Sequence, residues 1–143
     1  MLGLFKGLLV TLKHLTRPAF TVPYPFEKRA PAPRWRGRHA FRVDAVTNEP
    51  LCIGCQQCAR VCPDKLITIK TSKAPEGSAK KLQVDEATVD ISACMFCGLC
   101  EDACPTGAIV LTSFYEMATT DKQDLILNKE KLIESAKNYE PHE

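Results

Sequence analysis

Eight cysteines in two runs of identical spacing are the residues of this chain best suited to chemistry. The first run lies within residues 52–63 and the second within residues 94–105, and both read C-x2-C-x2-C-x3-C-P. No cysteine lies outside these runs. Thiolates are soft ligands, and this spacing is the one that surrounds the iron atoms of [4Fe–4S] clusters. The pattern predicts two such clusters and a chain that transfers single electrons.

The fourth cysteine of each run determines how the clusters share their ligands. Three cysteines at every third position surround one face of a cubane, whereas the fourth comes too late in the turn. In two-cluster bacterial ferredoxins it ligates the other cluster. We therefore assign the first cluster to Cys52, Cys55, Cys58 and Cys104. The second cluster is assigned to Cys94, Cys97, Cys100 and Cys62. Neither half is then expected to fold alone.

Two other uses of eight cysteines are disfavoured by the pattern. Four disulfides would suit a small secreted scaffold, which is usually shorter and denser in cysteine. Zinc is often bound by C-x2-C knuckles, but knuckles supply their ligands in pairs. Two runs of four cysteines, closed by Pro63 and Pro105, favour iron–sulfur clusters over both alternatives.

The net charge of +2 conceals two parts of opposite sign. Residues 1–43 contain nine Lys and Arg and a single acidic residue, Glu27, for a net charge of +8. Residues 44–143 contain ten Lys and Arg against sixteen Asp and Glu, for a net charge of −6. A basic arm on an acidic electron carrier is expected to contact something anionic, such as a partner subunit or lipid headgroups.

Residues 1–16 are predicted to form an amphipathic helix that faces a membrane or a partner protein. Its leucines recur at helical spacing, at Leu4, Leu8, Leu12 and Leu15. Lys6 and Lys13 bracket an apolar stretch far shorter than the ~20 residues of a transmembrane helix. The alternative is a helix packed on the chain's own domain, which we disfavour because the small cluster-binding unit offers little surface to cover it.

Five prolines punctuate residues 17–43, which are expected to form an extended basic arm without a regular element. Near its end the arm reads Arg-Trp-Arg-Gly-Arg-His, over residues 34–39. This segment is interpreted either as a solvated basic loop or as a docking segment. In the second case Trp35 is an apolar anchor and the arginines pair with carboxylates or phosphates. His39 is assigned no catalytic role.

Residues 44–114 are predicted to form an α+β unit with the duplicated, bacterial 2[4Fe–4S] ferredoxin-like fold. The two runs begin 42 residues apart, at 52 and 94, and a β-prone stretch follows each, at 66–69 and 108–111. Further strands are expected around 41–45 and 89–91, with another candidate at 82–84.

The tail, residues 115–143, is expected to contain a helix with the apolar stripe Leu125, Leu132, Ile133 and Ala136.

Several segments resemble the subunit I family of NADH–quinone oxidoreductase, respiratory complex I. They are Gly7–His14, Thr21–Pro25, Arg36–His39, Cys94–Cys100 and Cys104–Ile109. The cysteine runs alone fit many ferredoxins, whereas the N-terminal arm and the Arg-Gly-Arg-His segment narrow the resemblance to this family. It extends over nearly the whole chain.

The resemblance implies an electron-transfer subunit of a membrane-bound, proton-translocating NADH:quinone oxidoreductase. Electrons from NADH would pass through both clusters to a terminal cluster near the quinone. The chain alone would have no catalytic residue and no direct NADH or quinone site, and it lacks a Gly-rich dinucleotide loop. Its partners would be other peripheral-arm and membrane subunits and the membrane surface, not nucleic acid. It would lie at the cytoplasmic face of the inner (plasma) membrane.

Two other functions remain open. The first is a ferredoxin-type subunit of a membrane-bound hydrogenase or formate–hydrogen lyase complex. The sequence distinguishes this subunit from the oxidoreductase subunit less clearly. A soluble two-cluster ferredoxin that shuttles between enzymes needs no apolar helix followed by a basic, proline-rich arm. The residues of the arm favour the oxidoreductase subunit over both.

Overall fold

The computed structural model describes residues 2–44, 49–74 and 82–139. The chain divides into two compact units, Met1–Ala30 and Pro31–Glu143. Both cysteine runs lie in the second unit. The boundary falls inside the expected arm of residues 17–43, so residues 31–43 fold with the cluster-binding part of the chain.

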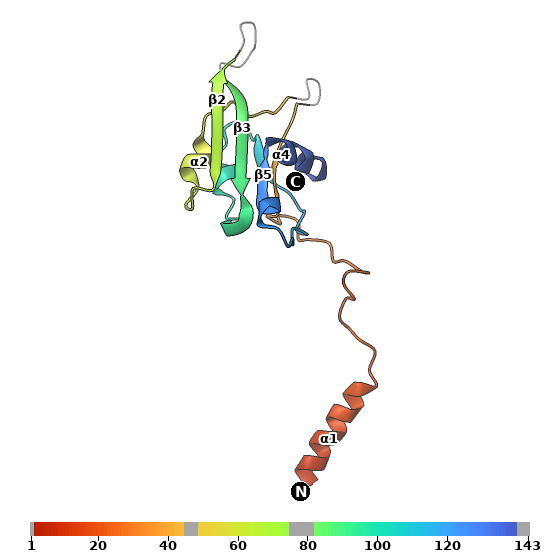
Figure 1. The fold of residues 1–143 in the computed structure, drawn as a ribbon. Helices are drawn as coiled ribbons and strands as arrows, with labels where there is room; N and C mark the ends of the chain where they lie inside the picture. The colour runs from red at the N-terminus through yellow and green to blue at the C-terminus, as the bar shows by residue number, and fades with distance from the viewer. Residues whose placement is uncertain (1, 45–48, 75–81, 140–143) are drawn as a thin grey trace. The chain divides into compact units, whose positions relative to one another are not determined.

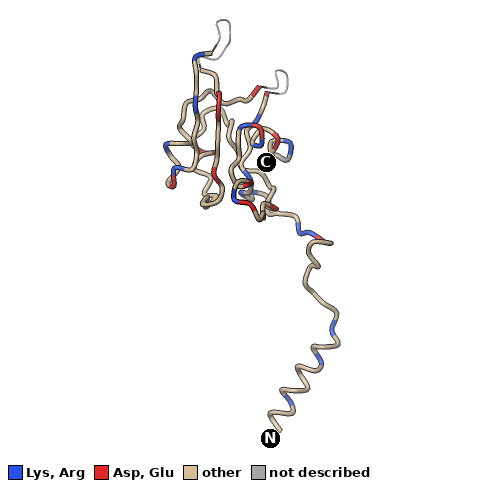
Figure 2. Tube along the Cα trace, viewed as in Figure 1, with Lys and Arg blue, Asp and Glu red and all other residues tan. Residues whose placement is uncertain are grey.

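The first unit is built around helix α1, Leu2–Leu15 (Figure 1), as expected for residues 1–16. None of its residues is buried, and Leu4 and Leu8 on its apolar stripe are 80 % and 66 % exposed. Figure 2 shows that the charged positions along this helix are basic, namely Lys6 and Lys13. Among the helices of the described residues, none combines the length and the apolar character that crossing a bilayer requires.

The smaller sheet of the second unit pairs β1, His39–Phe41, with β4, Ile109–Leu111, in antiparallel register. His39 lies opposite Leu111, and Phe41 lies opposite Ile109. Every residue of both strands is buried, because helix α4, Lys129–Ser135, packs against β1 and helix α3, Leu99–Asp102, packs against β4. A strand covered on both faces needs no alternation of apolar and polar residues.

The larger sheet has three antiparallel strands in the order β2-β3-β5 (Figure 1). These are β2, Ile67–Lys73, β3, Leu82–Asp90, and β5, Ile126–Asn128. In β2, Ile67 and Ile69 are buried and Lys70 is exposed, which is the period-two pattern of a half-buried strand. On the exposed face Lys70 Nζ lies 2.7 Å from Glu86 Oε2 of the facing strand.

Short helices connect and cover the sheets. They are α2, Gln57–Val61, α3, Leu99–Asp102, and α4, Lys129–Ser135, with 3-10 turns at Ile91–Ala93, Lys122–Leu125 and Ala136–Asn138. Helix α4 begins after Asn128, whose Oδ1 accepts a hydrogen bond from the Lys131 N–H at 2.9 Å and caps the helix. Leu132 of α4 is fully buried in a core that both sheets share with Cys58 and Cys100.

Several boundaries differ from those expected from the sequence. Strand β1 ends the arm, so the expectation that residues 17–43 contain no regular element is wrong at 39–41. The strand expected around 41–45 begins earlier, and residue 45 lies outside the described residues. One strand, β3, replaces the two stretches expected at 82–84 and 89–91, because β2 pairs with it over its whole length. The tail contains the expected helix, but it also contributes β5, which was not expected.

Candidate metal centres

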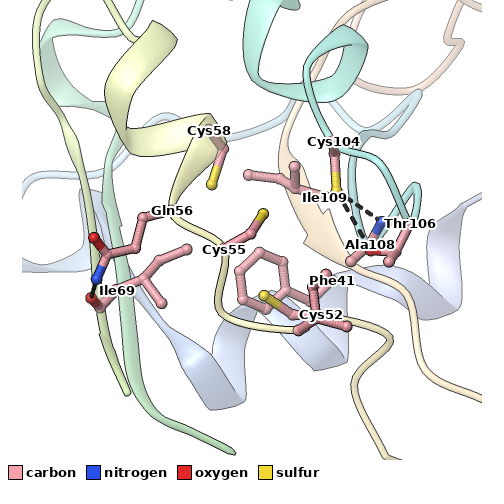
Figure 3. Close-up of a pocket in the computed structure, with 11 residues that line it drawn as sticks. Phe41, Cys52, Cys55, Gln56, Cys58, Ile69, Cys104, Thr106, Ala108 and Ile109 are labelled. Atoms are coloured by element: carbon pink, nitrogen blue, oxygen red, sulfur yellow. Dashed lines mark hydrogen bonds between the residues drawn. The ribbon is translucent and has the colours of Figure 1, made fainter. Parts of the chain in front are cut away.

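Four cysteines from both runs line one cavity of the second unit. Cys52, Cys55 and Cys58 come from the first run, on the loop before α2 and on α2 itself, and Cys104 comes from the second run. Figure 3 shows their side chains turned toward a common space. The remaining lining is largely apolar and includes Phe41, Ile69 and Ile109. The structure therefore brings together the four residues assigned to the first cluster.

A second cavity repeats this arrangement with the two runs exchanged. Cys94, Cys97 and Cys100 line it from the second run, and Cys62 lines it from the first. The remaining lining includes His39, Leu66, Ile67 and Val89. The four residues assigned to the second cluster thus also lie around one space.

The two ligand loops repeat the same backbone conformation 42 residues apart. Three pairs of equivalent positions have a positive φ, namely Gly54 with Phe96, Gln56 with Gly98, and Lys65 with Gly107. One residue of each pair is glycine, which adopts this conformation freely, and its partner is not. At Gly98 a Cβ atom would also lie only 2.9 Å from Arg36 Nε. A glycine in the sequence therefore marks only one of the two equivalent positions with a positive φ in each pair.

Backbone N–H groups donate hydrogen bonds to the fourth cysteine of each run. The Leu66 N–H donates to Cys62 Sγ at 3.4 Å, and the Ala108 N–H donates to Cys104 Sγ at 3.2 Å. Thr106 Oγ1 also lies near Cys104 Sγ, at 3.6 Å (Figure 3). Donors aimed at sulfur favour a thiolate over a thiol and stabilise negative charge in the cavity.

Burial affects the protonation of the cysteines. Burial, with a smaller effect from neighbouring cysteines, raises the pKa of Cys58 to about 11 and the pKa of Cys100 to about 12. Burial also acts to raise the pKa of Cys104, but hydrogen bonds from the Ile109 N–H and the Thr106 hydroxyl outweigh it and lower that pKa. Without metal the buried thiols keep their protons, which a bound iron would displace.

The residues present fit two cubane clusters. Each cavity offers four soft sulfur ligands, apolar walls and N–H donors to sulfur, which is the environment that a [4Fe–4S] cluster requires. Within the described ranges, no three His, Cys, Asp or Glu side chains are placed to share a single metal ion.

Comparison with known proteins identifies the family. Residues 51–108 match the model of a 4Fe-4S dicluster domain. Over 134 residues the chain is 35 % identical to NADH-quinone oxidoreductase subunit I 2 of Geobacter metallireducens, with 94 % of this chain and 98 % of that protein covered. The chain belongs to the NADH-quinone oxidoreductase subunit I family. It is an electron-transfer protein with two [4Fe–4S] clusters. The clusters predicted from the cysteine runs are confirmed, and so is the family indicated by the resemblance of the N-terminal segments.

Two other members of the subunit I family are longer than this chain. NADH-quinone oxidoreductase subunit I 2 of Symbiobacterium thermophilum is 37 % identical, and the chain spans 57 % of its length. NAD(P)H-quinone oxidoreductase subunit I of Gloeobacter violaceus is 36 % identical, and the chain spans 54 % of it. A chain in the structure of the membrane-bound sulfane sulfur reductase, an archaeal respiratory membrane complex, is 32 % identical with a TM-score of 0.54. That match covers 80 % of this chain and 55 % of the other.

Two residues of the Arg-Gly-Arg-His segment lie beside the second cavity of this subunit I chain, and neither was assigned to the site from sequence. Arg36 Nη1 donates to the Cys97 carbonyl oxygen at 2.6 Å, and His39 lines the cavity itself. Residues 34–36 are exposed, whereas Gly37 and His39 are buried, so the interpretation as a solvated loop is wrong for the second half of the segment only. Trp35 packs edge-on against Tyr115, with ring centroids 6.4 Å apart. The feature of the sequence that could have pointed to this segment is its resemblance to the subunit I family.

Proposed function

We propose that this chain relays single electrons through its two [4Fe–4S] clusters within a membrane-bound NADH:quinone oxidoreductase, toward the cluster nearest the quinone. The clusters supply the one-electron chemistry, and the chain positions them, excludes water and donates hydrogen bonds to their sulfur ligands. The family supports the complex, and the two cysteine-lined cavities support the relay.

We further propose that each cluster takes three ligands from one run and the fourth from the other. The first cluster is assigned to Cys52, Cys55, Cys58 and Cys104. The second cluster is assigned to Cys94, Cys97, Cys100 and Cys62. Support comes from the composition of the two cavities, each of which is lined by one of these sets.

One observation favours a relay over two independent sites. Helices α2 and α3 pack against each other, and each holds a buried cysteine that lines a different cavity. These are Cys58 of α2 and Cys100 of α3, which are close enough that Cys58 helps to raise the pKa of Cys100. Two clusters separated only by packed helices form a short path for an electron through the core.

The same proposal places the chain at the cytoplasmic face of the inner membrane, beside other subunits of the complex. The relatives are named as subunits of quinone oxidoreductases, and the solved structure belongs to a respiratory membrane complex. The first unit supports contact with lipid or a membrane subunit, because it exposes a leucine stripe and has five Lys and Arg against one Glu.

NADH should reduce both clusters in the purified complex that contains this chain. Freeze-quench EPR should show both clusters reduced after NADH is added and reoxidised after quinone is added. A Cys100→Ser complex should lose quinone reduction but keep electron transfer from NADH to an artificial acceptor that takes electrons upstream. If dithionite reduces both clusters and NADH reduces neither, the proposed electron donor is wrong.

The similarity to the sulfane sulfur reductase chain supports a second candidate, the same relay in a respiratory membrane complex with a different electron donor. Its identity of 32 % is close to that of the oxidoreductase subunits. The same experiment separates the two candidates, since dithionite but not NADH would then reduce the clusters.

Removing residues 2–30 should release the chain from membranes without loss of its clusters. The deleted residues form a unit of their own, and all eight cysteines lie in the other unit. We expect the iron content to be unchanged and the chain to move from the membrane fraction to the supernatant after cell lysis. Retention on membranes would show that the second unit alone holds the chain there.

Two single substitutions test the apolar face of α1 directly. Leu8→Gln places an amide on the leucine stripe, and Val10→Gln makes a similar change about 200° around the helix, at ~100° per residue. Both side chains are exposed, at 66 % and 57 %, so neither change opens a cavity. Leu8→Gln should weaken membrane association more than Val10→Gln, and equal effects would contradict a role for the stripe.

A further inference from the structure

His39 is a buried polar side chain with an unpaired nitrogen. Among the described residues three polar side chains are buried, namely His39, Thr112 and Ser135. The Thr112 hydroxyl donates to the Arg38 carbonyl oxygen at 2.9 Å, and the Ser135 hydroxyl donates to the Lys131 carbonyl oxygen at 2.6 Å. His39 Nδ1 has no hydrogen-bond partner, although the residue is only 2 % exposed.

An unpaired buried nitrogen is costly and requires an explanation. Such a group loses its hydrogen bond to water without gaining another, and native proteins tolerate few examples. Burial lowers the pKa of His39 to about 4, which disfavours the charged ring, and in either protonation state the imidazole keeps at least one N–H. A neutral imidazole in this position still needs one acceptor for that N–H.

The tertiary structure holds the ring at the second cavity. His39 lines it together with the four cysteines assigned to the second cluster. Strand β1 fixes its backbone opposite Leu111, and the Phe96 ring lies 5.7 Å from its own ring, centroid to centroid. Phe96 belongs to the ligand loop between Cys94 and Cys97, so the imidazole is packed directly against that loop.

The first cavity has no equivalent donor on the same strand. Phe41 lies two residues after His39 in β1, and residues two apart in a strand share a face. Phe41 lines the first cavity, as His39 lines the second. One strand thus presents an apolar ring to one cluster and an imidazole to the other.

We propose that the Nδ1–H of His39 donates a hydrogen bond to the sulfur atoms of the second cluster and thereby raises its reduction potential. Reduction adds negative charge to the cluster, so a donor stabilises the reduced state more than the oxidised state. His39 is then a positioning and tuning residue that sets the second cluster apart from the first. This inference rests on the ligand assignment proposed above.

The test is a mediated redox titration of the purified complex, followed by EPR, for wild type, His39→Phe and His39→Gln. The phenyl ring keeps the shape without the donor, and the glutamine amide restores an N–H. His39→Phe should lower the potential of the second cluster by about 59 mV, a tenfold change in its reduction equilibrium for one electron. His39→Gln should recover part of that shift, and the first cluster should titrate unchanged in both variants.

A second measurement needs no variant. In wild-type complex labelled with 15N-histidine, hyperfine spectroscopy of the reduced second cluster should detect a nearby nitrogen. Equal potentials for wild type and His39→Phe, absence of that coupling, or a coupling to the first cluster would overturn the proposal. The titration uses dithionite and mediators, so a failure of NADH to reduce the clusters would refute the proposed donor without affecting this result.

Discussion

Replacing Cys62 with serine should damage the cluster held by the second cysteine run, although Cys62 belongs to the first. Cys62 lines the cavity of the second run, and a serine hydroxyl is a harder and poorer ligand for iron than a thiolate. The reciprocal change, Cys104→Ser, should damage the first cluster. In each variant roughly half of the iron should be lost or altered, because two equal clusters share the eight cysteines. EPR of the reduced protein and iron analysis measure both effects.

Cys58→Ser is the matched control for this pair. Cys58 belongs to the first run and lines the first cavity, so its variant should have the same spectrum as Cys104→Ser and not that of Cys62→Ser. If Cys58→Ser and Cys62→Ser lose the same cluster, each run holds its own cluster and the crossed assignment fails.

Replacing Gly37 with alanine should destabilise the second unit strongly. An added Cβ would lie 2.2 Å from the Phe114 carbonyl oxygen and 2.7 Å from that of Thr112, and neither backbone atom can turn aside. The Gly37 N–H also donates to the Thr112 carbonyl oxygen at 2.8 Å, so the two segments would have to separate. We expect a loss of about 1–3 kcal/mol, typical of overpacking. The temperature at which the visible absorbance of the clusters disappears should fall by several degrees.

Gly7→Ala is the control for this substitution. Gly7 lies within α1, and an added Cβ there meets no atom within 4 Å. Alanine is favoured over glycine inside a helix by about 1 kcal/mol. The control should therefore leave the thermal loss of the clusters unchanged. Equal melting of wild type and Gly37→Ala would contradict the close packing of residues 37–38 against 112–114.

The sequence by itself was enough to predict the kind of cofactor, its number and the family. Ligand spacing within one run is a local property, because C-x2-C-x2-C can surround a cluster face with no help from distant residues. The leucine spacing of α1 is local in the same sense, and the helix appears where it was expected, at Leu2–Leu15. The resemblance to subunit I likewise rests on short contiguous segments.

Only the tertiary structure decided which residues far apart in the chain lie side by side. Nothing local to residues 34–39 shows that its first half is exposed and that Gly37 and His39 are buried. The difference comes from pairing with β4 and with Thr112, whose backbone lies more than 70 residues away in the chain. The pairing of β1 with β4 also places His39 at one cavity and Phe41 at the other, and a separate long-range pairing adds β5 to β3. Such contacts depend on burial and hydrogen bonding between distant strands, which the local preferences of a short segment do not encode.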